Sequence, residues 1–182
     1  RVLQSQGVAI EVLSGDAIPD SLFEAMFGFY RSTVLGQAWG RQYLNLHLFE
    51  LLRERFRHRL TFVVARQHGE PVAGTFHVVK GDTLYGRYWG ASRSLRHLHF
   101  NVCYYAAIEH CIAHGLQRFE PGAGGEYKQL RGFDAQPTWS AHFLAETRLA
   151  TAVERFLGFE RERTRELLEL YAEKSSLKPP PA

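Results

Sequence analysis

The spacing of hydrophobic residues changes several times along the chain, and each spacing predicts one kind of element. Leu22, Met26 and Phe29 recur at intervals of three to four residues, which places them on one face of a helix. Similar stripes of apolar residues run through 42–58 and 95–114. We therefore predict an amphipathic helix in each of these three parts of the chain.

Between the second and third of these helices the pattern shortens to that of β-strands. The segments 60–66, 72–79 and 83–89 are rich in β-branched and aromatic residues, and short glycine-containing turns separate them. Turns of this length join neighbouring antiparallel strands. The sequence therefore predicts an antiparallel meander of three strands.

Further elements are expected on both sides of the meander and its helices. Short strand patterns occupy 8–13 and 117–120, and alternating side chains predict another strand over 138–144. The segment 146–174 has the pattern of a long amphipathic helix, weakened by Gly158. In this order the elements predict the α+β class, with a central mixed β-sheet flanked by helices.

A single domain fits the length and composition. The chain has 182 residues, of which 45% are hydrophobic and 23% charged, as in ordinary soluble globular proteins. We expect one domain over 1–182, with 146–182 as its C-terminal helix and proline-rich tail. No run of about 18 apolar residues could span a bilayer. The formal net charge is +3, and the arginines are scattered among glutamates and do not form one basic block. This charge pattern permits contact with nucleic acid but does not indicate it.

The two cysteines, Cys103 and Cys111, are eight positions apart in a helical pattern. Their Cα atoms would lie about 12 Å apart, at 1.5 Å per residue, which is too far for a disulfide. Two unpaired thiols are typical of a reducing compartment, so we expect a cytoplasmic protein. We also expect both thiols to pack in the core and not to act as nucleophiles.

The densest chemistry lies in the glycine-rich segment 119–133. Four of its glycines fall within eleven residues, so the backbone can adopt positive φ and approach a ligand closely. The same segment carries two carboxylates, a lysine and an arginine: Glu120, Glu126, Lys128 and Arg131. It is either a binding loop or an ordinary solvated loop, and we favour the first.

Four segments, together with the order of elements, resemble one known family. They are Phe29-Tyr30-Arg31-Ser32-Thr33 with Trp39-Gly40, the strand Leu84-Tyr85-Gly86-Arg87-Tyr88-Trp89-Gly90, the helix Leu98-His99-Phe100-Asn101-Val102-Cys103-Tyr104-Tyr105, and the glycine loop through Arg131-Gly132. This combination resembles the GNAT (acyl-CoA N-acyltransferase) superfamily, and specifically its FemAB-like branch. The resemblance covers most of the chain.

The resemblance implies a bacterial group of N-acyltransferase-like proteins linked to peptidoglycan biosynthesis or recognition. Full-length members look like two such lobes in tandem, so this chain would be the C-terminal lobe and an N-terminal GNAT-like lobe would be its partner. The chain departs from the family pattern at Asn101, Gly124 and Tyr127, where an acidic residue, a glutamine and a histidine are often found. Roles tied to those residue types are therefore not carried over.

The GNAT resemblance also implies a place for an acyl donor. In that fold the pantetheine lies where two parallel strands separate, and its pyrophosphate binds backbone amides at the start of the next helix. The corresponding residues are Gly90, Ser92, Arg93, Ser94 and Arg96. Because this turn lacks closely spaced glycines, we expect acyl-CoA as a co-substrate at most, with no tightly bound cofactor. Ser92 and Ser94 have the alternative role of capping the helix.

Two groups of residues are candidates for substrate binding on regular elements. Strand alternation would place Tyr85, Arg87 and Trp89 on one face, where they could hold an anionic group or a sugar. Helical spacing would place Asn101 and Tyr105 on one face, where they could orient a substrate. The alternatives are a half-buried sheet face and a polar seam between neighbouring elements.

Polar residues in the last third of the chain are further candidates. Ser140 and His142 would share a face of the predicted strand and contact either substrate or structure. Lys128 and Arg131 would lower a carboxylate pKa or bind an anionic substrate. The histidines do not have the spacing of a metal site, so no metal is expected.

We predict Glu126 as the first candidate for proton transfer and Glu120 as the second, because both lie at the carboxyl end of a predicted central strand. The favoured function is an N-acyltransferase or aminoacyltransferase lobe in which an amine attacks the donor directly. The alternative is a non-catalytic lobe that recognises a cell-wall sugar-peptide or tRNA. The residues do not select between a thioester and an aminoacyl-tRNA donor.

Overall fold

The chain divides into two compact units, Arg1–Gly122 and Ala123–Ala182. The computed structural model describes residues 2–36, 41–122, 126–175 and 177, with only the backbone at Val2 and Glu126. We describe each unit by itself. The single domain over 1–182 stays a prediction.

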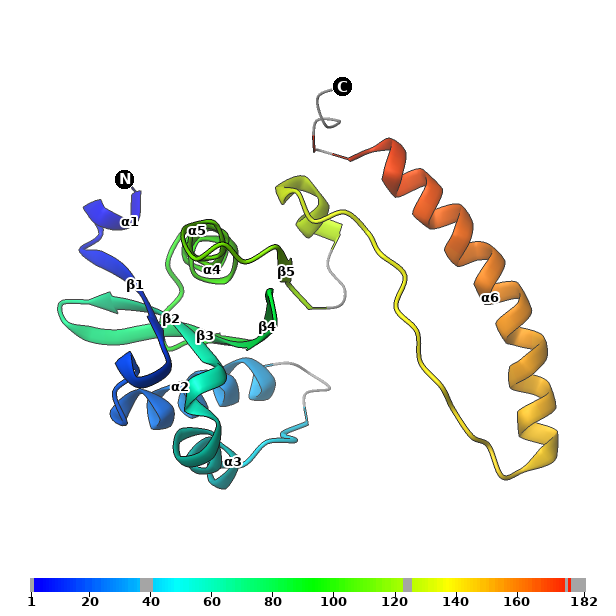
Figure 1. Cartoon of the computed structure of the whole chain (residues 1–182), viewed down its shortest axis with the longest axis horizontal. Coiled ribbons are helices and arrows are strands. Elements are labelled where there is room, and N and C mark those ends of the chain that lie inside the picture. Colours follow the sequence, from blue (N-terminus) through cyan, green and yellow to red (C-terminus); the bar gives the residue numbers. More distant parts are fainter. Residues whose placement is uncertain (1, 37–40, 123–125, 176, 178–182) are drawn as a thin grey trace. The chain divides into compact units, whose positions relative to one another are not determined.

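The first unit is built on a five-stranded sheet in which neighbours in sequence are neighbours in space (Figure 1). Each strand is antiparallel to the next, except that the last two are parallel. The mixed α+β architecture and the central meander are therefore confirmed. The strands are β1 (Val8–Ser14), β2 (Leu60–Gln67), β3 (Glu70–Lys80), β4 (Thr83–Ala91) and β5 (Arg118–Glu120).

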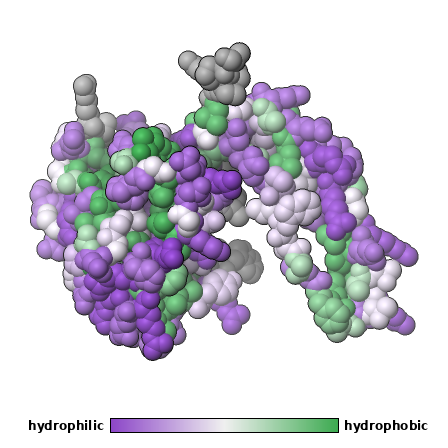
Figure 2. Space-filling view, viewed as in Figure 1, coloured by the Kyte–Doolittle hydropathy of each residue, from purple (hydrophilic) through white to green (hydrophobic). Residues whose placement is uncertain are grey.

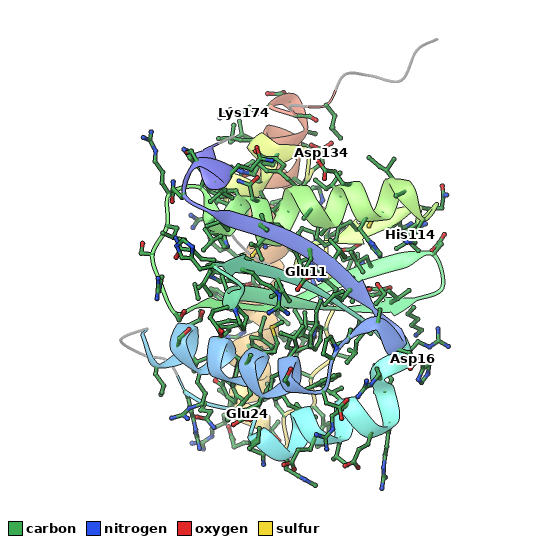
Figure 3. All side chains as sticks on the ribbon, turned by 90° about the vertical axis from the view of Figure 1, so that its left-hand side faces the viewer. Glu11, Asp16, Glu24, His114, Asp134 and Lys174 are labelled. Carbon is green, nitrogen blue, oxygen red and sulfur yellow. The ribbon has the colours of Figure 1, made fainter. Side chains whose placement is uncertain are left out.

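Helices cover both faces of this sheet (Figures 1 and 3). In Figure 3, Glu24 marks the side of α2 and α3, and His114 marks the side of α5. The helices of this unit are α1 (Val2–Ser5), α2 (Ser21–Leu35), α3 (Leu46–Leu51), α4 (Leu98–Phe100) and α5 (Ala106–Ala113); α3 continues into a π-helical turn (Leu52–Phe56) and a 3-10 turn (Arg57–Arg59), a π-helical turn (Asn101–Tyr105) joins α4 to α5, and a further 3-10 turn is Gly15–Ala17.

Two of the predicted helices begin later than their hydrophobic stripes suggest. The stripe at 42–58 becomes helical only at Leu46, because the Asn45 side chain accepts a hydrogen bond from the Leu48 amide at 3.0 Å and caps the helix there. The stripe at 95–114 becomes helical at Leu98, after His97 with its φ of 65°. The Asn45 cap therefore marks the start of one helix, and the left-handed backbone at His97 precedes the start of the other.

Strand alternation divides the core between the two faces. Phe62 and Val64 of β2 pack with α2 and α3, whereas Val63 and Ala65 pack with Leu98 and its neighbours. A third cluster joins β4 and β5 to α5. All four β2 side chains are buried, so β2 is covered on both faces.

A close contact between a helix and the sheet lies where α2 crosses β4. A Cβ atom built on Gly90 would lie 1.7 Å from the Phe29 carbonyl oxygen, and one on Gly74 would lie 2.8 Å from Cε of Met26. These two glycines are partners across β3 and β4. Glycine at this pair therefore lets the α2 backbone rest on the sheet.

The second unit contains a 3-10 turn (Glu126–Arg131), a segment without regular structure, and the long helix α6 (Thr147–Glu173). The Glu146 carboxylate accepts from the Arg148 and Leu149 amides, which confirms the predicted start of this helix. Within the unit, Gln129 donates to the Tyr171 carbonyl at 2.6 Å. Apolar residues of this unit are exposed, as the green areas along α6 in Figure 2 show.

The predicted strand at 138–144 is wrong. This segment has no strand structure, and Trp139 and Phe143 are each 90% exposed. Alternation of side chains makes a strand only where a neighbouring strand supplies hydrogen-bond partners, and the described residues supply none here. In the described ranges, every helix is too short or too polar to cross a membrane.

Substitution of Gly90 tests the contact between α2 and β4. We expect Gly90→Ala to lower the free energy of unfolding by on the order of 3 kcal/mol, because the new methyl group would overlap the Phe29 backbone. Urea denaturation measures this change. Gly28→Ala is the matched control: it lies within α2 with no atom within 4 Å of the new Cβ, and it should stabilise by up to about 1 kcal/mol. Equal effects of the two variants would contradict the assignment.

The buried His77 predicts a loss of stability in acid. Burial lowers the pKa of His77 from 6.5 to about 4, because a charged ring would lose its hydration. The unfolded chain binds this proton more readily, so the free energy of unfolding should be highest above pH 6.5 and fall from there towards about pH 4. The part due to His77 is on the order of 3 kcal/mol, at about 1.36 kcal/mol per pKa unit.

Urea unfolding across this pH range measures the slope. His77→Gln should flatten it, whereas His58→Gln, at an exposed position, should leave it unchanged. The same slope in His77→Gln and in the original protein would show that another group carries the acid sensitivity.

Candidate functional site

The candidate site lies where β4 and β5 separate. The two parallel strands pair over only three residues each, from Thr83 opposite Arg118 to Tyr85 opposite Glu120. β5 ends at Glu120, whereas β4 continues to Ala91. Beyond Tyr85, this edge of β4 therefore has no strand partner among the described residues.

A β-bulge interrupts β4 within this open stretch. His77 is opposite Gly86 and Thr75 is opposite Trp89, so β4 has two residues where β3 has one. The extra residue reverses the alternation, and the prediction that Tyr85, Arg87 and Trp89 share a face is wrong. Tyr85 shares the face of its partner Val78, towards α2, whereas Trp89 packs on the opposite face.

Two side chains from the end of α2 form hydrogen bonds to backbone carbonyls of the open edge. The Thr33 hydroxyl donates to the Trp89 carbonyl at 2.7 Å, and the Ser32 hydroxyl lies 3.1 Å from the Ala91 carbonyl. On the other edge, the Ser92 amide donates to Val72 of β3 at 2.9 Å. Backbone groups alternate between edges in an antiparallel ladder, so the amides of Trp89 and Ala91 also point to the open edge.

A pocket of about 330 Å³ lies at the end of this edge. Trp89 and His99 form part of its wall, with ring centroids 4.9 Å apart in an edge-to-face arrangement. This volume is within the range of small-molecule sites. The full lining is Ser32, Thr33, Trp89, Ala91, Ser92, Arg93, Ser94, Leu95, Leu98 and His99.

Three of the residues predicted to bind a donor line this pocket: Ser92, Arg93 and Ser94. The alternative that Ser92 and Ser94 cap the helix is wrong, because the helix begins at Leu98 and the residue before it makes no side-chain cap. Ser92 instead donates through its hydroxyl to the Val72 carbonyl at 3.1 Å. Arg93 donates to the Gln67 side chain at 3.1 Å.

The other two predicted donor residues lie beside the pocket. Gly90 is buried in β4 beneath α2, where the close approach of Phe29 accounts for a glycine. Arg96 is exposed in the turn that leads to α4. Their part in donor binding stays a prediction.

The structure places the predicted substrate residues of the first unit in different surroundings. Arg87 is exposed at the bulge. The Asn101 side chain donates to the His97 carbonyl at 2.8 Å, within its own helix. Tyr105 is 45% exposed. Glu120 ends β5 next to Gly86: a Cβ built on Gly86 would lie 3.2 Å from the Glu120 carbonyl oxygen.

The remaining predicted residues belong to the second unit. Glu126 begins its 3-10 turn, but the Glu126 side chain lies outside the described part of the structure. Arg131 donates to the Tyr127 carbonyl at 2.5 Å, and Lys128 lies between them in the same turn. His142 Nε2 and the Ser140 hydroxyl are 2.9 Å apart, so these two residues do meet, although on an irregular and exposed segment.

Sequence reasoning missed three polar residues of the pocket, Ser32, Thr33 and His99. Ser32 and Thr33 were part of a family-like segment, but nothing in the chain shows that the end of α2 lies beside β4. His99 was part of another family-like segment and one of the histidines discounted as metal ligands. Among the described side chains, no three of His, Cys, Asp or Glu converge to hold a metal ion.

Two titratable groups on α5 have shifted pKa values. Burial, and secondly the neighbouring His114, lower the pKa of His110, whose ring centroid is 4.0 Å from that of His114. Burial raises the pKa of the Cys111 thiol. Cys103 and Cys111 are both buried and neither forms a disulfide, which confirms that both thiols are part of the core.

Comparison with solved structures identifies the fold. An aminoglycoside acetyltransferase from an uncultured soil metagenomic sample, solved with sisomicin, is 11% identical over 80% of this chain and 99% of its own, with a TM-score of 0.54. A protein described as a possible acetyltransferase from Clostridium difficile 630 is 9% identical over 76% and 99%, also with a TM-score of 0.54. The ribosomal-protein-alanine N-acetyltransferase from Brucella melitensis biovar Abortus 2308 is 13% identical over 76% and 97%, with a TM-score of 0.50.

No protein of curated function matches the sequence significantly. The family model named FemAB-like, described as peptidoglycan biosynthesis/recognition, matches residues 1–179. The separated β4 and β5, the helices on both faces of the sheet and the acetyltransferase-like fold agree with that match. The chain therefore belongs to the FemAB-like family and has the GNAT acyltransferase fold.

Proposed function

We propose that this chain transfers an acyl or aminoacyl group to an amine, with the donor held along the open edge of β4. The observation that carries the proposal is the early end of β5, which leaves the outer edge of β4 from Gly86 to Ala91 without a strand partner among the described residues, beside a pocket. The amine nitrogen attacks the donor carbonyl carbon, a C–N bond forms, and the C–S or C–O bond to the carrier breaks. The proton lost by the amine ends on the leaving thiol or hydroxyl, so no oxidant is needed.

Backbone amides supply the stabilising groups that this reaction requires. The amides of Trp89 and Ala91 point to the open edge, where they can donate to the donor carbonyl or to the oxyanion that forms from it. Arg93 and Arg96, with Ser92 and Ser94, are suited to an anionic part of the donor beyond the end of β4. Acyl-CoA fits this arrangement as a co-substrate, and an aminoacyl-tRNA offers similar anionic groups.

Carboxylates near the strand separation would accept the proton of the attacking amine. Glu120 shares the α2 face with its neighbour Tyr85, at the point where β5 leaves β4. Glu126 remains the other candidate, in the loop that follows. Tyr85, Arg87 and Trp89 would contact substrate from different sides of the bulge, and Asn101, Tyr105, Lys128, Arg131, Ser140 and His142 remain proposed contacts.

A second candidate function is recognition without turnover. The edge-to-face pair of Trp89 and His99 in the pocket favours it, because flat ring surfaces also bind sugars. The ligand would then be a cell-wall sugar-peptide, and tRNA would be the other ligand to test. The two functions differ in what the loss of a carboxylate does.

Substitution of the two carboxylates distinguishes the functions. In transfer from acetyl-coenzyme A or aminoacyl-tRNA to an amine-bearing peptidoglycan fragment, Glu120→Gln or Glu126→Gln should lower kcat by about 10²–10⁴-fold with little change in donor binding. Glu70→Gln, at an exposed position of β3, is the control. Detectable binding of the fragment with no turnover by the original protein would favour recognition.

Thermal shift with acetyl-coenzyme A tests the place of the donor. A ligand that binds only the folded state raises the midpoint of unfolding. We expect a rise that the Arg93→Ala, Arg96→Ala double variant loses, and a smaller rise with adenosine diphosphate alone. A rise that persists in the double variant would place the anionic part of the donor elsewhere.

The cysteines test whether the attack is direct. Because both thiols are buried and burial raises the pKa of Cys111, neither is suited to carry a covalent acyl intermediate. Cys103→Ala and Cys111→Ala should therefore retain kcat within a few-fold, with a loss of stability on the order of 1 kcal/mol from lost packing. Loss of turnover in a variant that stays folded would contradict direct attack.

A further inference from the structure

The last turn of α2 supplies hydrogen-bond donors to two carbonyls of β4, as a neighbouring strand would, but it supplies no acceptor for the β4 amides. Thr33 donates to the Trp89 carbonyl at 2.7 Å, and Ser32 reaches the Ala91 carbonyl at 3.1 Å. Ser32 has a single hydroxyl proton and also lies 2.7 Å from the Phe29 carbonyl, so Thr33 makes the firmer of the two contacts. Among the described contacts, neither hydroxyl accepts a hydrogen bond from the Trp89 or Ala91 amide.

The position of these hydroxyls is fixed by packing. Gly90 lies between Trp89 and Ala91, and its Cα meets the α2 backbone at Phe29. The next residues of the helix, Ser32 and Thr33, are thereby carried to the edge of β4, three and four positions further along one helical turn. Their contacts follow from the same close approach that requires glycine at position 90.

The hydrogen bonds to these carbonyls change which groups the β4 edge offers to a ligand. A strand added to a sheet needs both an acceptor and a donor from each outward-facing residue. Here the Trp89 carbonyl accepts from Thr33 and the Ala91 carbonyl lies within reach of Ser32, so the amides are the groups that this edge offers most readily, and pairing with a further strand is disfavoured. The pocket in front of it is therefore suited to a ligand rich in acceptors, such as carbonyl, carboxylate or phosphate oxygens.

We propose that Ser32 and Thr33 are positioning residues for the acyl donor: by bonding the carbonyls of Trp89 and Ala91, they hold the β4 edge apart from other strands and leave its amides as donors to the ligand. The inference rests on the proposed function for the identity of the ligand. The state of the edge itself follows from contacts within the first unit and does not depend on the ligand. Neither hydroxyl takes part in the chemical step.

The experiment has a ligand-free arm. Amide hydrogen exchange, followed by NMR, should be fast at Trp89 and Ala91 and slow at Ser92, whose amide bonds to Val72. In Thr33→Val, which keeps the shape and removes the hydroxyl, exchange at Trp89 should slow by about tenfold or more as the edge finds another partner. Thr33→Ser should restore fast exchange. Slow exchange at Trp89 and Ala91 in the original protein, or no change in Thr33→Val, would overturn the proposal.

The second arm measures acetyl-coenzyme A binding by calorimetry. Thr33→Val should weaken binding by about tenfold, the worth of one hydrogen-bonding position, and Thr33→Ser should restore it. Ser14→Ala is the control, since it removes a hydroxyl pair with Thr61 at 2.9 Å on β1 and β2. Equal weakening in Ser14→Ala would reduce the role of Thr33 to general stability and overturn the proposal. No binding by the original protein would count against the thioester donor of the proposed function, while the exchange result would still decide the state of the edge.

Discussion

The backbone of α2 touches the backbone of β4 at Phe29 and Gly90, and the candidate site is arranged around that contact. A side chain at position 90 would overlap the Phe29 carbonyl, so only glycine lets the helix lie this close. The approach buries Met26 and Phe29 against the sheet and carries the end of α2 to the edge of β4. Hydroxyls of the helix then meet strand carbonyls that would otherwise remain unpaired. One steric contact thus joins the core to the pocket.

The sheet explains why the site lies at this edge. β2 and β3 are paired on both sides, so their backbone groups are satisfied and unavailable to a ligand. β4 is paired on both sides only as far as Tyr85, after which β5 ends and a bulge changes the direction of the side chains. Backbone donors, an aromatic pair and an arginine therefore come together at the end of one strand. This opening is the place that we propose for the acyl donor.

Much of the element order could be predicted from local patterns, and the failures have separate physical causes. The meander and α2 follow from apolar spacing that a single buried face imposes. The second helix begins later than its hydrophobic stripe because the Asn45 side chain caps the helix at that point. The segment 138–144 alternates like a strand but finds no partner in the described chain. The prediction that Tyr85 and Trp89 share a face failed because β4 contains a bulge, and the alternation of side chains in the sequence cannot reveal the extra residue.

The sequence by itself determined the α+β class, the mixed sheet, the buried thiols and the family, because periodicity and local motifs depend on residues close to one another in the chain. It also predicted a donor site in the turn after β4, and the structure places Ser92, Arg93 and Ser94 of that turn in the pocket lining. Only the tertiary structure decided that Ser32 and Thr33 meet β4, that Trp89 faces His99, and that Gly90 serves packing. Those contacts join residues more than fifty positions apart or depend on a bulge, so they arise from how the elements pack and not from any local pattern.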